Sequence, residues 1–231
     1  MNKGRLQSLD ILRGITIAAM ILVNDPGSWS HVYAPLLHAP WHGCTPTDLV
    51  FPFFLFMVGL AVSLGTPKVG TERRIAIKQI AKRSLYLILI GLFLNGFPYF
   101  DFESIRIFGV LQRIGLVFLS VAIIYQLSSF QTQLWIGGGL LLGYWAAMTL
   151  IPIPGFGSAN LNIGTNLAAW VDYSLLPGHL WAGSKTWDPE GLLSTFPAIV
   201  TGLLGMFTGK MLFKAEEKTK ALLQVFVLAN I

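Results

Sequence analysis

The chain has 231 residues, of which 54% are hydrophobic and 12% are charged, and its net charge is +5. Soluble domains carry about 25% charged residues, and the mean hydropathy of this chain is +0.64. These values exclude an ordinary water-soluble globular protein. Because the apolar residues come in long spans, the sequence predicts an integral membrane protein. With one cysteine, Cys44, no internal disulfide can form.

We expect an all-α, polytopic bundle of transmembrane helices in a single transmembrane domain. Six apolar segments are each about long enough to cross ~30 Å of hydrocarbon. In chain order these predicted spans cover residues 9–27, 48–66, 84–100, 107–127, 134–151 and 191–212. A further apolar run begins at Ala221, and it is too short to cross before the sequence stops at Ile231. We therefore expect a seventh helix that is cut off, and a longer family domain of which residues 1–231 are the N-terminal part.

The segments between the predicted spans differ strongly in charge. Residues 67–83 hold six Lys or Arg and residues 210–220 hold four, whereas residues 28–47 hold none and residues 152–190 hold one. The positive-inside rule then places the N-terminus and both basic segments in the cytoplasm, and the other two segments on the outer face. The spacing in 67–83 predicts a basic amphipathic stretch on the lipid surface. Because these cations encode topology, they do not argue for nucleic-acid binding.

His38 is the main candidate for acid–base chemistry. It lies four residues before His42 in the outer segment that leads into the second span. Two histidines at this spacing can share a helix face and hold a metal, but Pro40 interrupts them and no third ligand has matching spacing, so we expect no metal. An imidazole, with an ordinary pKa of about 6.5, can accept a proton near neutral pH. The alternative is a pair of interfacial histidines beside Trp41 in an aromatic belt.

Asp48 and Asn24 lie at the outer ends of the second and first predicted spans. Asp48 is expected to cap the second helix or to orient an imidazole through a carboxylate–histidine contact, and the two roles are compatible. The Asn24 amide is a candidate donor to a developing oxyanion, and its alternative role is to stop the first helix.

Arg13 and Arg113 are cations inside apolar spans. Such charges are costly in a membrane and usually mark a ligand or ion path. Arg113 lies about two turns inside its span, and its planar guanidinium suits phosphate. Arg13 lies closer to the cytoplasmic end of its span, so the alternative for it is snorkelling to the membrane surface.

Four sequence blocks, in the same order, resemble the heparan-alpha-glucosaminide N-acetyltransferase family and its bacterial relatives. They are RLQSLDILRGITIAAMILVN (5–24), LHAPWHGCTPTDLVFPFFLFMVG (37–59), RIFGVLQRIGLVFL (106–119) and DPEGLLSTFPAIVTGLLGMFTGK (188–210). The most specific block is L-H-A-x-W-x-G followed by D-L-V-F-P.

This resemblance implies a multi-pass enzyme that moves acetyl from cytoplasmic acetyl-CoA to an amino sugar on the far side of the membrane. The family's active-site histidine corresponds to His38, and its asparagine at the end of the first span corresponds to Asn24. Arg113 and Arg13 are then candidates for contacts with the phosphates or pantetheine of CoA. The chain starts without the N-terminal lumenal extension of the animal enzyme, so it is similar to a bacterial inner-membrane version.

A transporter or carrier for a small sugar or anionic metabolite is the competing function, because Gly- and Pro-interrupted spans with intramembrane Arg also suit a substrate path. The expected partners are membrane lipid, acetyl-CoA and an amino-sugar or glycan acceptor. The sequence leaves open the identity of the acceptor, and whether the chain is a homo-oligomer.

Overall fold

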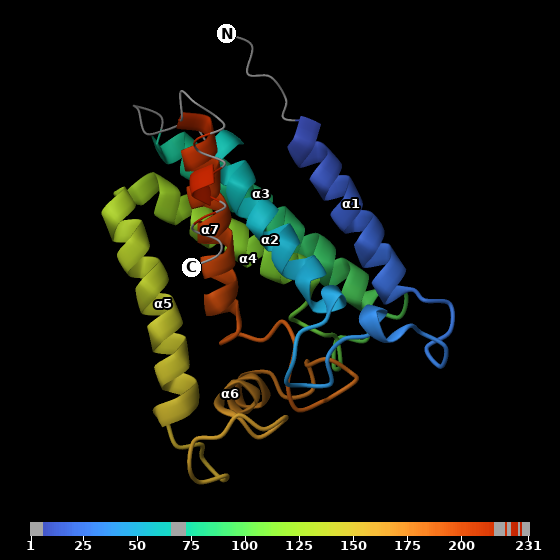
Figure 1. Cartoon of the computed structure of the whole chain (residues 1–231). Coiled ribbons are helices and arrows are strands. Elements are labelled where there is room, and N and C mark those ends of the chain that lie inside the picture. Colours follow the sequence, from blue (N-terminus) through green and yellow to red (C-terminus); the bar gives the residue numbers. More distant parts are fainter. Residues whose placement is uncertain (1–6, 66–72, 215–219, 221–222, 226, 228–231) are drawn as a thin grey trace.

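The computed structural model of the chain (Figure 1) describes residues 7–65, 73–214, 220, 223–225 and 227. Within these residues the secondary structure is helical, apart from one isolated bridge between Ile153 and Gly157. The helices are α1 (Gln7–Asn24), η1 (Ala34–Leu36), α2 (Pro46–Gly65), α3 (Arg73–Gly96), α4 (Val110–Leu127), α5 (Phe130–Leu150), α6 (Leu167–Leu175) and α7 (Thr195–Lys214). The all-α prediction is confirmed for this part of the chain.

Local sequence signals explain several helix ends. α1 stops at Asn24, where Asp25, Pro26 and Gly27 follow, and Gly27 adopts a φ of 72° that favours glycine. α5 starts after Ser129, whose hydroxyl accepts a hydrogen bond from the Thr132 amide. The Asn166 side chain caps α6 in the same way.

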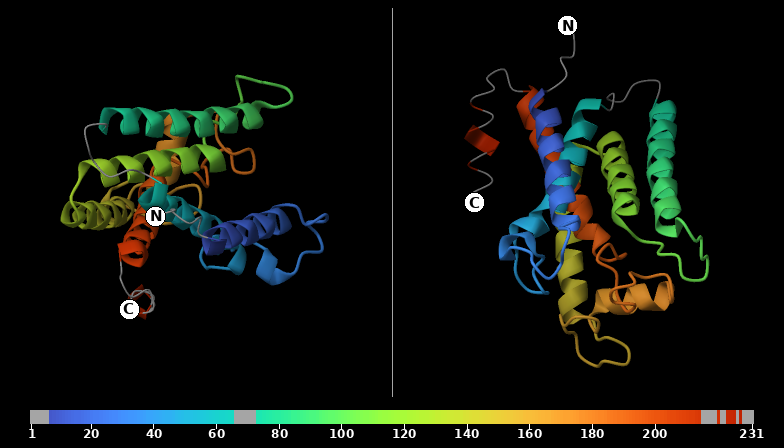
Figure 2. Two further views of the ribbon diagram at one scale, coloured as in Figure 1. Left: turned by 90° about the horizontal axis from the view of Figure 1, so that it is seen from above. Right: turned by 90° about the vertical axis from the view of Figure 1, so that its right-hand side faces the viewer.

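α2 and α7 form the centre of the bundle and pack with their backbones in direct contact. A Cβ atom added at Gly59 would lie 1.7 Å from the Gly202 carbonyl oxygen, and one added at Gly205 would lie 1.9 Å from the Phe56 carbonyl oxygen. Small residues permit this close approach of membrane helices. α4 packs against both central helices, while α3 covers α4, α1 covers α2 and α5 covers α7 (Figure 2).

Apolar side chains lie both inside the bundle and on its outer surface. Leu55, Val117, Val121, Leu203 and Met206 are buried where α2, α4 and α7 meet. The peripheral helices expose further large apolar side chains, which include Ile15 and Ile21 on α1, Leu89 and Phe93 on α3, and Leu142 and Trp145 on α5. A soluble monomer rarely exposes so much contiguous apolar surface. The arrangement is therefore that of a membrane protein.

Three of the described helices are long and apolar enough to cross a membrane: Pro46–Gly65, Val110–Leu127 and Thr195–Leu212. The prediction of six complete spans and a seventh partial one is therefore not confirmed. Six long helices do occur, one at each predicted span, and they alternate in direction (Figure 1). The run that begins at Ala221 falls mostly outside the described residues.

The helical spacing in the segment 67–83 predicts a basic amphipathic stretch before the third span. Residues 73–83 are helical, but they continue without a break into the apolar residues as the first turns of α3. Residues 73–83 contain no Gly or Pro, and Lys and Arg are good helix formers, so nothing separates them from the apolar residues that follow. The remainder of that segment, residues 67–72, lies outside the described residues. Likewise α7 continues to Lys214, into the predicted loop 210–220, and the predicted outer loop 152–190 contains α6.

Candidate active site

His38 and Asp48 form a hydrogen-bonded pair at the start of α2. The Nδ1 atom of His38 lies 2.6 Å from Oδ1 of Asp48. An ionised carboxylate only accepts hydrogen bonds, so in neutral His38 the proton is on Nδ1 and the lone pair is on Nε2. The His38 side chain is 60% exposed. Nε2 has no hydrogen bond to any residue in the described part of the chain, so it can receive a proton from a substrate.

The other oxygen of Asp48 holds the loop that carries His38. Oδ2 accepts hydrogen bonds from the Thr45 amide at 2.8 Å and from the Ala39 amide at 3.2 Å. The Thr45 hydroxyl lies 2.7 Å from the Leu37 carbonyl oxygen, which fixes the residue just before His38. Asp48 is the third residue of α2 and not its N-cap, but its carboxylate reaches back to the preceding turn as in a capping box. One carboxylate therefore both caps α2 and orients the imidazole.

Asn24 is the last residue of α1 and its side chain is exposed. Its Nδ2 atom donates to the Met20 carbonyl oxygen at 2.9 Å, within its own helix. Among the described residues no hydrogen bond joins Asn24 to His38 or Asp48. The structure therefore brings two of the three predicted catalytic residues together and places the third at the neighbouring helix end, where its second amide N–H stays available.

The remaining histidines have other contacts. His42 packs against Trp41 with ring centroids 6.4 Å apart. Nδ1 of His31 lies 2.9 Å from the Ser30 hydroxyl, and Nδ1 of His179 lies 2.8 Å from the Ile105 carbonyl oxygen. Among the described residues no group of three or more His, Cys, Asp or Glu is placed to hold a metal ion.

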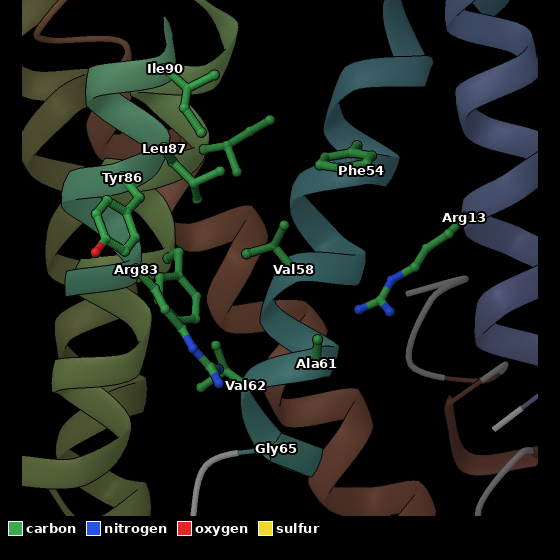
Figure 3. Close-up of a pocket in the computed structure, with 12 residues that line it drawn as sticks. Arg13, Phe54, Val58, Ala61, Val62, Gly65, Arg83, Tyr86, Leu87 and Ile90 are labelled. Carbon is green, nitrogen blue, oxygen red and sulfur yellow. The ribbon is translucent and has the colours of Figure 1, made fainter. Parts of the chain in front are cut away.

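A pocket of about 450 Å³ lies between α1, α2, α3 and α4, toward the end of the bundle where α1 begins. Its walls are mostly apolar, but Arg13 of α1 and Arg83 of α3 extend toward α2 from opposite sides (Figure 3). Arg13 is also 3.8 Å from Asp10. Two cations in an apolar pocket are the groups that an amphiphilic anion would require. His38, Asn24 and Asp48 do not line this pocket.

Arg113 lies outside this pocket, and its guanidinium group forms hydrogen bonds with other residues of the protein. Its guanidinium donates to the Gly191 carbonyl oxygen at 3.0 Å and to the Ser194 hydroxyl. The side chain is buried and does not line the pocket that contains Arg13. These contacts tie α4 to the segment that leads into α7, and the predicted contact of Arg113 with a ligand stays a prediction.

Buried and half-buried charges join the loops at the α6 end of the bundle. Arg106 donates to Asp188 at 2.8 and 2.6 Å and to Glu190 at 2.5 Å. Burial alone would lower the pKa of Arg106, but these carboxylates raise it above its ordinary value. Burial raises the pKa of Asp172, whose carboxylate accepts hydrogen bonds from the Leu192 and Asp188 amides. This network fixes the segment that precedes α7.

A family described as heparan-alpha-glucosaminide N-acetyltransferase, catalytic, matches residues 5–228 of the chain. The chain belongs to this family. It is 30% identical to the human heparan-alpha-glucosaminide N-acetyltransferase over 269 aligned residues, which cover 95% of this chain and 40% of the human protein. It is 29% identical to the mouse protein of the same name, over 97% of this chain and 42% of the mouse protein. The chain thus spans less than half the length of these relatives.

The blocks that resemble the N-acetyltransferase family meet in pairs in space. Residues 7–24 of the first block form α1. Block 37–59 forms the loop with His38 and most of α2, and α1 packs against α2. Blocks 106–119 and 188–210 meet at the ion pair of Arg106 and Asp188 and at the contacts of Arg113. The four blocks therefore form two neighbouring regions of the structure: one around the start of α2, and one where α4 meets the segment before α7.

Two features of this N-acetyltransferase family member escaped the sequence reasoning. The sequence interpretation assigned Arg83 to the basic segment 67–83. Its position directly before an apolar span could have indicated that its side chain faces the inside of the bundle. The contacts of Trp41 with the distant residues Trp187 and Leu161 have no local signal at all.

Proposed function

We propose that the protein is an acyl-CoA-dependent N-acetyltransferase of the cell inner membrane. It would move acetyl from cytoplasmic acetyl-CoA to a glucosamine-like amino sugar on the periplasmic side. The observation that carries this proposal is the exposed His38–Asp48 pair at the mouth of α2, in a chain that belongs to this family. The imidazole has a free Nε2 atom, and it is held by a carboxylate, as in sites of acyl transfer.

The proposed orientation places the N-terminus in the cytoplasm and all six long helices across the membrane. The helices alternate in direction, so the start of α1 lies at the same end of the bundle as the starts of α3 and α5 (Figure 1). The basic residues of early α3, which include Arg74, Lys78 and Lys82, lie at this end. The site residues lie at the other end, which the positive-inside rule assigns to the periplasm.

The pocket between α1 and α4 supports a path for the acetyl donor. It extends along α2 from Gly65 to Phe54, a rise of about 16 Å, and ends about 9 Å along the helix from Asp48. In this proposal Arg13 and Arg83 hold the phosphates of CoA near the cytoplasm, because guanidinium groups match phosphate geometry. The thin pantetheine arm would then carry the thioester toward His38.

Two chemical routes fit the free Nε2 atom of His38. In direct transfer Nε2 removes a proton from the acceptor amine as the amine attacks the thioester carbonyl, and the thiol of CoA leaves with that proton. In covalent transfer Nε2 attacks the carbonyl first and CoA leaves as the thiolate. The amine then takes acetyl from the imidazole, and the proton that the amine loses passes to the thiolate to give the free thiol of CoA. In both routes Asp48 stabilises the positive imidazole and Asn24 donates to the oxyanion. Trapping of acetyl-His38 by rapid quench would identify the covalent route.

The experiment that tests this function is a turnover assay on the protein in proteoliposomes with a panel of amino sugars. We expect free CoA and N-acetylated sugar in equal amounts, and CoA release only when an acceptor is present. Movement of unmodified sugar or anion across the membrane, without CoA release, would instead support the transporter, which a pocket with two cations also suits.

Replacing Arg83 by glutamine should raise the KM for acetyl-CoA about tenfold and change kcat little, because a charge-assisted contact to phosphate is lost. Arg13→Gln should act in the same direction. The matched control is Lys82→Gln, which removes the same charge from a residue that does not line the pocket. Equal KM values for the Arg83 and Lys82 variants would place the CoA phosphates elsewhere.

A further inference from the structure

Three indole rings from two loops pack together, and one of them belongs to the loop that carries His38. The ring centroids of Trp41 and Trp187 are 5.3 Å apart, and those of Trp187 and Trp181 are 5.7 Å apart. Trp41 follows His38 by three residues, whereas the other two belong to the segment between α6 and α7. We call Trp41, Trp181 and Trp187 the indole cluster.

The Trp41 ring is held in place by the protein. Its Nε1 atom donates a hydrogen bond of 2.8 Å to the Leu161 carbonyl oxygen. The Asn160 side-chain oxygen accepts from the Asn162 amide and the Thr165 hydroxyl, so the loop around Leu161 is itself braced. A Trp of the membrane interface usually directs its N–H to water or lipid headgroups. Here the protein backbone accepts that bond, which leaves only the apolar ring available to a ligand.

Trp41 nevertheless stays accessible, since it is 37% exposed. Trp187 meets it at an interplanar angle of 74°, so the neighbouring ring touches by an edge-to-face contact rather than covering Trp41 as a parallel stack. A fixed and accessible indole loses little conformational entropy when a flat ligand binds. Such a ring prefers aromatic groups and cations as ligands. A sugar ring that presents its C–H groups and carries an ammonium group can make similar contacts.

We propose that Trp41, supported by Trp187 and Trp181, is the platform on which the acceptor sugar stacks. The inference rests on the proposed function, and it names the class of acceptor: an amino-substituted pyranose with an apolar C–H face. The polar rim of the sugar remains toward water. Trp41 and His38 are three residues apart on one loop, so the amino group of a stacked sugar is directed to the imidazole.

The test measures binding of D-glucosamine to the protein in nanodiscs without acetyl-CoA, by saturation-transfer NMR and by titration of tryptophan fluorescence. Trp41→Leu should raise the Kd for glucosamine, and the KM for this acceptor, by at least about tenfold, because the stacking face is lost. Its kcat and its KM for acetyl-CoA should change by less than about threefold. Trp41→Phe keeps an aromatic face and should stay within about threefold of the unchanged protein.

The matched control is Trp29→Leu, because Trp29 is 65% exposed, lies on the same connection between α1 and α2 and makes no ring contact with the indole cluster. An unchanged Kd for Trp41→Leu, or an equal loss with Trp29→Leu, would overturn the proposal. If Trp41→Leu does not fold, 19F NMR of the fluorotryptophan-labelled, otherwise unchanged protein decides, since the Trp41 signal must shift at saturating glucosamine. Binding without acetyl transfer would refute the proposed function and leave the platform standing.

Discussion

Replacing His38 by alanine is expected to lower kcat for acetyl transfer about a thousandfold, since both chemical routes pass through Nε2 of this residue. The His38 side chain is exposed, and among the described residues it hydrogen-bonds only to Asp48, so its removal should leave the bundle folded. The assay is release of free CoA in the presence of glucosamine, with an unchanged melting temperature as evidence of folding.

His42→Ala is the matched control for this prediction. His42 lies on the same loop, but its ring packs against Trp41, and in the described part of the chain it makes no hydrogen bond to Asp48. We expect its kcat to fall by less than about threefold, on the scale of an exposed position. A His38 variant that turns over at the rate of the His42 variant would refute a chemical role for His38.

Asp48→Asn provides a graded test of the same pair. Asparagine retains one oxygen acceptor for the Thr45 amide but cannot stabilise a positive imidazole as a carboxylate does. The expected result is a kcat intermediate between those of the unchanged protein and His38→Ala, with a similar KM for acetyl-CoA. A lower melting temperature with a normal kcat would show that Asp48 only caps α2 and does not assist His38.

Gly205→Ala is expected to have a large effect on stability. The added Cβ would lie 1.9 Å from the Phe56 carbonyl oxygen and 3.1 Å from the Leu60 amide nitrogen, both of which are backbone atoms that cannot rotate away. α2 and α7 would have to separate along the centre of the bundle. Overpacking of this kind costs about 3 kcal/mol or more. Thermal unfolding in detergent should show a melting temperature well below that of the unchanged protein.

Gly138→Ala is the control for this substitution. It adds the same methyl group to α5, where nothing lies within 4 Å of the new Cβ. The expected effect is neutral to slightly stabilising, because alanine favours a helix more than glycine does. If both glycine variants melted at the same temperature, the close contact of α2 with α7 would not be a main source of stability.

The sequence predicted which segments are helical more accurately than it predicted where each helix begins and ends. Breakers such as Pro26 and Gly27 end a helix locally, so the end of α1 was placed within a few residues. The start of α3 was misplaced because a change from basic to apolar residues marks a change of surroundings, and the helix at Arg73 passes through it. Hydrogen bonding within the helix does not depend on whether its side chains face lipid or water.

The pairing of His38 with Asp48 was also within reach of the sequence, since they are separated by ten residues and one helix start. By itself the sequence determined the all-helical class and the membrane character, because these follow from composition and short-range spacing. Only the tertiary structure placed Arg83 opposite Arg13, turned Arg113 toward Gly191, and joined Trp41 to Leu161 across 120 positions. Such contacts depend on which helix faces pack together, and side-chain packing across the whole bundle decides that.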